Sequence, residues 1–326
     1  MTSKAMFLSS SQGWHWDRQF PDGVTTWRDV DFIFSGSAKE SDVVFVFDDL
    51  PSEIKIATKT SVFVASEPKS IKQYDRAFLS QFDVVLTTDE STSHPGRKLS
   101  QLGLPWHIGA WSTDGQLLSD PINYRAFESL YPKKTKSISV VASNKAYTPG
   151  HRARLSFAEK LKGYFGDEID VFGRNIRGFG DKTEVLLDYR YHVAIENSRH
   201  DDYWTEKLSD TYLALTYPIY FGCSNIGEYF PSDSMTSIDI RDVPAAIRTI
   251  KKLIESDVAE RCRQHLETAR KKVLEQHNLF NIMTTEFELL DGSPLKNKVL
   301  LPEKHFTRAK KPFRRLLDGF RRMKSS

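Results

Sequence analysis

The chain has 326 residues, about twice the length of a common single domain, so two domains are expected and a miniature disulfide-stapled scaffold is excluded. Its 39% hydrophobic and 12% aromatic residues are typical of a globular protein rather than a disordered one. The net charge of +3 hides an asymmetry: residues 304–326 hold nine Lys or Arg against one Asp, so the rest of the chain is mildly acidic and is not expected to bind nucleic acid.

The cellular compartment is predicted from the N-terminus and the cysteines. The N-terminus becomes polar at Ser9, too early for the apolar core of a secretory signal, and no apolar run approaches the ~20 residues of a membrane span. Cys223 and Cys262 are too few for a disulfide framework or a four-ligand zinc site, and they are expected to be reduced, inert thiols. The chain is therefore predicted to be cytoplasmic.

Residues 1–115 are predicted to form a first Rossmann-like domain. Short β-branched or aromatic runs alternate there with polar or amphipathic stretches such as Ile71–Phe82, which is typical of a largely parallel α/β sheet. The predicted strands are Met6–Ser9, Asp31–Phe34, Val43–Phe47, Val62–Ala65, Val84–Leu86 and Pro105–Gly109.

The strand rhythm is lost over residues 116–136, which are predicted to be a linker. A second Rossmann-like domain is predicted over residues 137–300, closed by amphipathic helices between Val243 and Gln276. Its predicted strands are Ile138–Ala142, Ile169–Phe172, His192–Ile195, Ile219–Phe221 and Met235–Ile240.

Residues 301–326 are predicted to be a basic tail. Behind Pro312, apolar residues recur at helical spacing and are flanked by arginines, which predicts an amphipathic helix lying on an anionic membrane surface. The apolar positions are Phe313, Leu316, Leu317 and Phe320. Because Gly319 weakens this helix, a disordered or merely solubilising basic end is the alternative.

Candidate binding residues follow the predicted strands of the second domain, because open α/β sheets bind ligands at the carboxyl ends of their strands. Three such ends carry polar or cationic residues, and the first leads into a helix near Arg154. The three ends are Ser143-Asn144, Gly173-Arg174 and Glu196-Asn197-Ser198.

A further candidate site lies where Thr205 can act as the N-cap of a helix. Glu206 and Lys207 would then occupy the first turn, where free N–H groups and the helix dipole favour an anion. A lysine at this end opposes the dipole, and a bound diphosphate would resolve the conflict. The alternative is a solvated lysine beside Glu206.

Several ordered segments within about residues 138–240 carry a family resemblance. Glu196-Asn197-Ser198 behind Ile195, then Tyr203-Trp204-Thr205-Glu206-Lys207 and Tyr217–Gly222, resemble the Phe-Glu-Asn-Ser, Asp-Tyr-x-Thr-Glu-Lys and x-Pro-Val-x-x-Gly signature of the α-1,3/1,4-fucosyltransferases of glycosyltransferase family 10. Ile195 stands where the family usually has Phe. Upstream, Ser143-Asn144 with Arg154, and then Val171–Arg174, resemble two more family segments in the right order.

The resemblance implies a GT-B fold, in which two Rossmann-like domains face a cleft, with the nucleotide sugar held by the second domain and the glycan acceptor by the first. By motif position, Arg154 and Lys207 would contact the diphosphate, Glu206 the ribose, and Asn197 and Tyr203 the nucleotide pocket. Two cations and a helix N-terminus would neutralise the departing GDP, so no metal or other cofactor is expected.

An inverting transfer also needs a carboxylate that takes the proton of the acceptor hydroxyl. Glu67 is the candidate, because Ser66-Glu67-Pro68 follows a predicted strand and is similar to the Glu-Ser-Pro segment of the family, although it lacks the serine between Glu and Pro. A turn residue before Pro68 is the alternative. Other carboxylates that follow strands are held in reserve: Asp48, Asp49, Asp89 and Glu90.

The sequence thus predicts transfer of fucose from GDP-fucose to a hydroxyl of a cell-surface glycan of the lipopolysaccharide or capsule type, on the inner face of the cytoplasmic membrane. A lipid-linked acceptor would make the tail useful as an anchor. The alternatives are a transferase using another nucleotide sugar and a non-catalytic protein that binds membrane or nucleic acid through its tail. Dinucleotide and P-loop glycine motifs are missing, and the histidines lack metal-ligand spacing.

Overall fold

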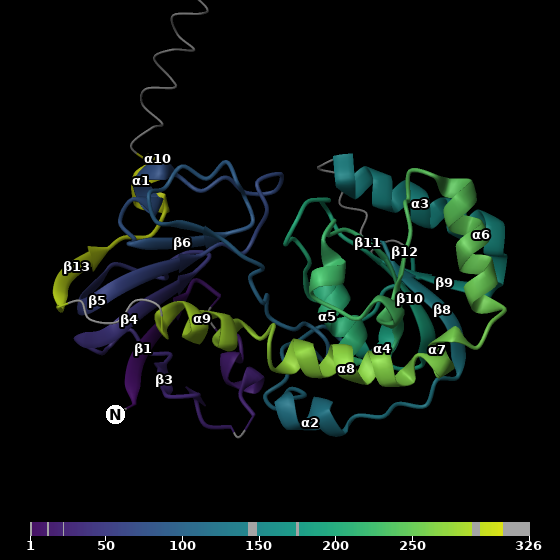
Figure 1. Cartoon of the computed structure of the whole chain (residues 1–326), viewed down its shortest axis with the longest axis horizontal. Coiled ribbons are helices and arrows are strands. Elements are labelled where there is room, and N and C mark those ends of the chain that lie inside the picture. The colour runs from purple at the N-terminus through teal and green to yellow at the C-terminus, as the bar shows by residue number, and fades with distance from the viewer. Residues whose placement is uncertain are drawn as a thin grey trace, which may run out of the picture. The chain divides into compact units, whose positions relative to one another are not determined.

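The structure, a computed structural model, describes residues 2–11, 13–21, 23–142, 149–173, 176–288 and 294–308. The chain divides into two compact units (Figure 1). Unit 1 comprises residues 1–14, 25–100 and 283–326, and unit 2 comprises residues 15–24 and 101–282. Each unit is built on a largely parallel sheet, so the predicted α/β class with two Rossmann-like units is confirmed.

Unit 1 contains a sheet whose strands run in the order β2-β3-β1-β4-β5-β6-β7, with β13 paired to β5. The pairs β2–β3 and β5–β13 are antiparallel and the others parallel. The central strand β4 forms because Val43–Phe47 is an unbroken apolar run, buried on both faces. The elements are β1 (Ser3–Ser9), β2 (Thr26–Trp27), β3 (Val30–Ile33), β4 (Glu40–Phe47), β5 (Ile54–Val64), α1 (Arg76–Leu79), β6 (Val84–Thr87), β7 (Arg97–Leu99), β13 (Lys296–Leu300) and α10 (Lys304–Arg308).

Unit 2 contains a parallel sheet with the order β12-β11-β10-β8-β9. Counted from β8, this is the 2-1-3-4-5 order of doubly wound folds, whose direction of winding reverses between β8 and β10. Its elements are α2 (Tyr124–Ser129), β8 (Lys136–Val141), α3 (Pro149–Phe165), β9 (Ile169–Phe172), α4 (Thr183–Leu186), β10 (Tyr189–Ile195), α5 (Glu206–Leu213), β11 (Tyr217–Phe221), β12 (Thr236–Ser237), α6 (Val243–Ile254), α7 (Val258–Arg261) and α8 (Arg263–Leu274). The helix α9 (Leu279–Glu288) begins in this unit.

The helix α3 of unit 2 shows how the sequence positions a functional side chain. Phe157, Leu161 and Phe165 recur at helical spacing and are buried, which fixes the face that α3 turns inward. Arg154 lies one turn before Phe157 on that face and is only 6% exposed. A guanidinium is therefore held among apolar side chains, where a charge is costly unless it has a partner.

The predicted strand over Pro105–Gly109 is wrong, because this segment belongs to unit 2 and forms no ladder there. Side chains of unit 2 bind its backbone instead. Arg18 donates hydrogen bonds to the carbonyl oxygens of Trp106 and Ile108 at 3.4 and 2.5 Å, and carboxylates accept the N–H groups that follow. A short apolar run cannot by itself distinguish a strand from a buried irregular segment.

The predicted linker over residues 116–136 also differs from the structure, since it lies inside unit 2. Phe127 of α2 is fully buried and meets Trp106 edge-to-face with 5.8 Å between ring centroids. Lys134 donates to the carbonyl oxygens of Leu187 and Ala214, both at 2.8 Å, and so ties residues 132–136 to the ends of α4 and α5. Lys134, one of the lysines that suggested a linker, therefore fastens the chain.

The predicted end of the second domain at residue 300 is wrong as well. β13 pairs with β5 of unit 1, and Lys298 there binds Asp83 at 2.5 Å. The backbone N–H of Glu303 donates to Asp49 at 2.9 Å, so residues 301–308 are bound to unit 1 rather than forming the start of a tail. A strand supplied from about 240 residues away leaves no local signal in the sequence.

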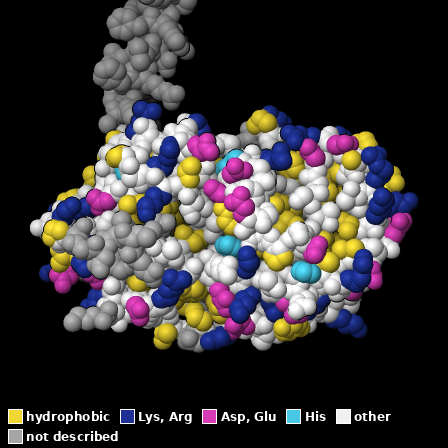
Figure 2. All heavy atoms as spheres, viewed as in Figure 1, with side chains coloured by type: hydrophobic (Ala, Val, Ile, Leu, Met, Phe, Trp, Pro, Cys, Tyr) yellow, Lys and Arg dark blue, Asp and Glu magenta, His cyan; other side chains and the backbone are white. Residues whose placement is uncertain are grey.

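The remaining expectations concern the surface and the chain ends. Cys223 is buried, Cys262 is only half-buried, and neither forms a disulfide in the structure. Among the described residues, no helix combines the length and apolarity needed to cross a membrane. On the face drawn in Figure 2, Lys and Arg side chains are interspersed with Asp and Glu. The predicted amphipathic helix from Phe313 to Phe320 lies outside the described residues.

Candidate functional site

The candidate site lies in unit 2, where β8 and β10 end side by side. These two strands flank the reversal of winding, which is where open α/β sheets leave a crevice for a ligand. A cavity of about 180 Å³ opens there. Four of its lining residues are charged: Arg154, Lys182, Glu206 and Lys207.

Glu196, the first residue after β10, holds the start of α5. Its carboxylate accepts hydrogen bonds from the backbone N–H of Thr205 at 2.8 Å and from the Thr205 hydroxyl at 2.7 Å. A Cβ at Gly222 would lie 2.4 Å from Cγ of Glu196, so only glycine fits beside this carboxylate. The Glu-Asn-Ser and Pro-x-x-x-Gly segments therefore depend on each other through direct contact.

Thr205 is the N-cap of α5, as predicted, and its hydroxyl accepts the N–H of Lys207. The Lys207 ammonium turns back over the helix start, where it donates to Oγ1 of Thr205 and to Oε1 of Glu206, both at 3.1 Å. It also lies 3.6 Å from Oε2 of Glu196. A cation at a helix N-terminus opposes the dipole, so these two carboxylates compensate for that conflict.

Burial and charge determine the protonation of this cluster. Burial works to lower the pKa of Lys207, but Glu206 and Glu196 outweigh it and hold the pKa above its usual value. Burial likewise works to raise the pKa of Glu206, yet Lys207, Lys182 and His107 hold it well below the usual range. For Glu196, burial prevails over Lys207 and raises the pKa. Lys207 and Glu206 are therefore an ionised pair.

Arg154 reaches the same site from α3. Its Nη1 donates to Oδ1 of Asn197 at 2.8 Å, whereas its buried Nε has no hydrogen-bond partner among the described residues. Burial lowers the pKa of Arg154, against the opposing charges of Glu196 and Glu206. A buried N–H donor without an acceptor carries a desolvation cost that an incoming anion would relieve.

Tyr203 is buried beside these residues and stacks on the ring of His200, with 4.8 Å between centroids. The next residue, Trp204, packs edge-to-face against Phe230 at 5.1 Å. Aromatic packing thus positions the loop between Glu196 and Thr205.

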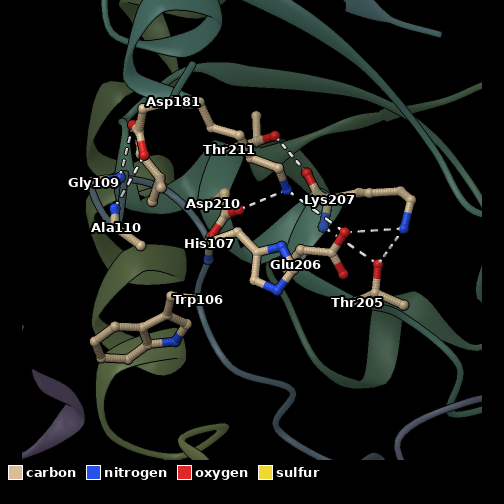
Figure 3. Close-up of polar contacts among 12 residues, drawn as sticks. Trp106, His107, Gly109, Ala110, Asp181, Thr205, Glu206, Lys207, Asp210 and Thr211 are labelled. Carbon is tan, nitrogen blue, oxygen red and sulfur yellow. Dashed lines mark hydrogen bonds and ion pairs between the residues drawn. The ribbon is translucent and has the colours of Figure 1, made fainter. Parts of the chain in front are cut away.

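Sequence reasoning missed four residues of the polar network that extends from Glu206, namely His107, Asp181, Lys182 and Asp210. Figure 3 labels His107, Asp181 and Asp210 with part of this network. His107 points toward the Glu206 carboxylate, and its backbone N–H donates to Oδ1 of Asp210 at 3.0 Å. Lys182 binds Oδ2 of Asp210 at 2.7 Å. Asp181 accepts the N–H groups of residues 109, 110 and 111 at 2.9 to 3.0 Å.

Burial lowers the pKa of His107, although the charges of Glu206 and Asp210 oppose this effect. No sequence pattern marks His107 or Lys182 as a site residue, because both reach the site from loops and only tertiary contacts bring them there. Asp210 had a weak signal, since a carboxylate on the buried face of α5 requires a partner.

Glu67 lies in unit 1, where it follows β5 and is exposed, and it lines a cavity of about 190 Å³ together with Asp89. The reserve residue Asp48 is engaged elsewhere in that unit. Its carboxylate accepts hydrogen bonds from Ser66, Lys72 and Tyr74 at 2.7 to 2.9 Å. These donors overcome the effect of burial and hold the pKa of Asp48 below its usual value.

Six of the predicted site residues are thus brought together in unit 2: Arg154, Glu196, Asn197, Tyr203, Glu206 and Lys207. Three more lie outside the described residues: Ser143, Asn144 and Arg174. Among the residues that the structure describes, no group of three or more His, Cys, Asp and Glu side chains could hold a metal ion.

Two cations beside a helix N-terminus, at the winding reversal of a parallel sheet, form the arrangement with which α/β proteins bind nucleotide phosphates. Residues 131–257 match the family described as glycosyltransferase family 10 (fucosyltransferase) C-term. The resemblance predicted from the sequence is therefore confirmed for the donor-binding region.

Similar proteins carry related names. A putative fucosyltransferase-like protein of Arabidopsis thaliana is 27% identical over 245 residues, which are 72% of this chain and 42% of that protein. The human 4-galactosyl-N-acetylglucosaminide 3-alpha-L-fucosyltransferase FUT6 is 30% identical over 154 residues, which are 46% of this chain and 39% of that protein. The chain thus spans about two fifths of these relatives. A crystal structure of an alpha1,3-fucosyltransferase with GDP-fucose aligns with 89% of this chain and 91% of that one, at 17% identity and a TM-score of 0.49.

Proposed function

We propose that the protein is an inverting, metal-independent glycosyltransferase of the GT-B type that transfers fucose from GDP-fucose to a hydroxyl of a cell-surface glycan. The observation that carries this proposal is the ionised Lys207 beside Arg154 at the N-terminus of α5. The family match over residues 131–257 supports the reaction class. The fucosyltransferase names of the relatives support fucose as the sugar.

In this mechanism, Lys207 turns from Glu206 to the diphosphate, and Arg154 directs its buried Nε–H toward the same anion. The bond between the anomeric carbon and the phosphate oxygen breaks, and the charge that develops on GDP is neutralised by both cations and the helix N-terminus. Glu206 holds the ribose, while Asn197 and Tyr203 belong to the nucleotide pocket.

The acceptor hydroxyl oxygen forms the new bond to the anomeric carbon on the opposite face, and its proton passes to Glu67. The acceptor is a glycan of the lipopolysaccharide or capsule type, and a lipid-linked one would place the reaction at the inner face of the cytoplasmic membrane. Binding of that membrane is assigned to the basic tail.

Calorimetry with GDP tests the donor site. GDP should bind equally well with and without EDTA, and Lys207→Ala should weaken binding by about 1.5 to 3 kcal/mol, the range for a hydrogen bond to a charged group. Lys252→Ala removes an exposed lysine of α6 and is the matched control for loss of one positive charge. Unchanged affinity in Lys207→Ala would remove the diphosphate assignment.

A competition and transfer assay then tests the sugar and the reaction. GDP-fucose should bind more tightly than GDP-mannose or a UDP-sugar, and transfer should invert the anomeric configuration, which proton NMR of the product reports. Preference for another nucleotide sugar would keep the reaction class and change the donor. Binding without transfer to any glycan acceptor would favour a non-catalytic protein.

A further inference from the structure

The residue that carries a further inference is Lys182, which immediately precedes α4 and lines the cavity of the candidate site. Its ammonium lies 2.7 Å from Oδ2 of Asp210 and 3.6 Å from Oε1 of Glu206. The side chain of Asp210 is fully buried and those of Lys182 and Glu206 are less than a fifth exposed. Lys182 is therefore part of a desolvated charge network rather than a surface lysine.

One oxygen of Glu206 is shared between two ammonium groups. Oε1 accepts from Lys207 at 3.1 Å and lies 3.6 Å from Lys182 (Figure 3 shows the Lys207 contact). If Lys207 turns to a diphosphate, Glu206 loses its nearer cation while a second anion arrives close by. A largely buried carboxylate left without a counter-charge is costly, so this step needs a second cation that stays in place.

Lys182 meets this requirement because Asp210 fixes it. Oδ2 of Asp210 holds the Lys182 ammonium, and Oδ1 accepts the backbone N–H of His107, so Asp210 is itself held from two sides. Among the described residues, Lys207 contacts Thr205 and Glu206 at 3.1 Å and Glu196 at 3.6 Å. None of these contacts is as short as the 2.7 Å ion pair between Lys182 and Asp210. The two lysines thus differ in their freedom to leave Glu206.

We propose that Lys182 is a positioning residue that stays with Glu206 as its counter-ion and thereby releases Lys207 to bind the diphosphate of the donor. The inference rests on the proposed function, because it requires a diphosphate ligand at Lys207. It assigns no direct contact between Lys182 and the nucleotide.

The protonation of Glu206 offers a readout that a purely structural role would not move. Among the described residues, the charged and titratable groups that face Glu206 are Lys207 and Asp210 on α5, Lys182 before α4, His107, Arg154 on α3 and Glu196 after β10. The cations prevail over burial and keep Glu206 ionised in wild type. Without Lys182, Glu206 should take up a proton at higher pH.

The test is calorimetry with GDP on the full chain. At pH 7.5, Lys182→Met should weaken GDP binding by about tenfold or more, the scale of one lost charge-assisted contact. Lys182→Arg should stay within about threefold of wild type, because it keeps the charge, and Lys252→Met should be unchanged. As the pH falls toward 5, the defect of Lys182→Met should shrink, because a protonated Glu206 no longer holds Lys207.

A double-mutant cycle tests whether Lys182 affects GDP binding through Glu206. In a Glu206→Gln background, Lys182→Met should cost much less than in wild type, because residue 206 no longer carries a charge. An equal defect in both backgrounds and at all pH values would overturn the proposal, as would unchanged affinity in Lys182→Met. If Lys182→Met does not fold, Lys182→Gln replaces it in the test, because glutamine keeps a hydrogen-bond donor for Asp210. If neither variant folds, Lys182 is a structural residue and the proposal is wrong.

The same experiment separates the role of Lys182 from the proposed function. Failure of wild type to bind GDP would overturn the proposed function, and this inference with it. GDP binding by wild type that is insensitive to Lys182→Met would overturn only the role of Lys182.

Discussion

The buried charges of unit 2 show what a single side chain contributes to the site. Lys207 and Arg154 are both cations with few routes to solvent, and each is positioned by a neighbouring polar group rather than by the ligand. Arg154 was predicted because it follows the polar end of a strand and lies in a segment that resembles the family, and Lys207 because it stands at the start of a helix. Preorganised donors of this kind stabilise a departing diphosphate without reorganising during the reaction.

Lys182 and His107 could not be predicted in the same way. Each lies in a loop distant in sequence from Glu206, and no periodicity links them to it. Their role follows only from tertiary contacts through Asp210. Residue types that are common in exposed loops therefore give no site signal until the fold brings them together.

Glu67 is the proposed acceptor of the proton from the acceptor hydroxyl, and this role can be tested by substitution. Glu67→Gln should keep GDP affinity while transfer falls by about 100-fold or more, because an amide cannot take the acceptor proton. GDP calorimetry and the rate of transfer to an accepted glycan measure the two effects. Asp89→Asn, in the same cavity, is the control and should stay near wild type. The role would pass to Asp89 if that variant were the inactive one.

At the scale of elements, sequence patterns predicted most strands of both sheets but not how the segments between them are held. The runs that became β1, β3, β4, β6, β8, β9, β10 and β11 are dominated by apolar residues, which are buried in the structure. Residues 105–111 have a similar composition, yet their N–H groups are bound by Asp210 and Asp181 instead of a strand. Composition alone cannot distinguish a segment whose backbone N–H groups are bound by side-chain carboxylates from a segment that pairs as a strand.

The contribution of these hydrogen bonds to stability can be tested at Asp181. Its two oxygens accept four backbone N–H groups, from residues 109, 110, 111 and 183, and the residue is only 3% exposed. Asp181→Asn should destabilise the protein by about 2 to 3 kcal/mol, because the amide nitrogen cannot accept a hydrogen bond. Thermal unfolding should then begin about 5 to 10 °C lower.

A matched control for this change is Asp188→Asn. The side chain of Asp188 is half exposed and lies 3.3 Å from Lys136, an ion pair of the kind that contributes little to stability. Its unfolding midpoint should remain within about 2 °C of wild type. If Asp181→Asn were as stable as Asp188→Asn, the 109–111 segment would not depend on carboxylate capture.

In the whole molecule, each unit is assembled from segments that are not consecutive in the sequence. The sequence predicted two α/β units because the strand rhythm occurs twice, and this division into two is confirmed. The points at which the chain passes from one unit to the other were not predictable. Residues 15–24 belong to unit 2, and the chain returns to unit 1 at Met283. These points depend on long-range pairing, as between β13 and β5, which leaves no periodic signal.

The return of the chain to unit 1 decides how the tail should be tested. Glu303 accepts the N–H of Asp75 at 2.8 Å and lies 3.6 Å from Lys72, so a truncation at residue 301 would remove part of unit 1. A chain ending at Arg308 keeps these contacts and removes seven Lys or Arg. It is therefore the proper comparison with the full chain.

The full chain should sediment with anionic vesicles at low salt, whereas the chain ending at Arg308 should not. Each basic residue near an acidic membrane surface contributes about 1 kcal/mol, and salt screens this attraction, so binding should fade at high salt and on neutral vesicles. A variant with Leu316→Asn and Phe320→Asn keeps every charge but loses the apolar stripe. It should bind more weakly than wild type if the tail lies in the membrane interface as an amphipathic helix. Equal sedimentation of the full and shortened chains would exclude the tail as the anchor, and equal binding of the full chain and the double variant would reduce the interaction to charge alone.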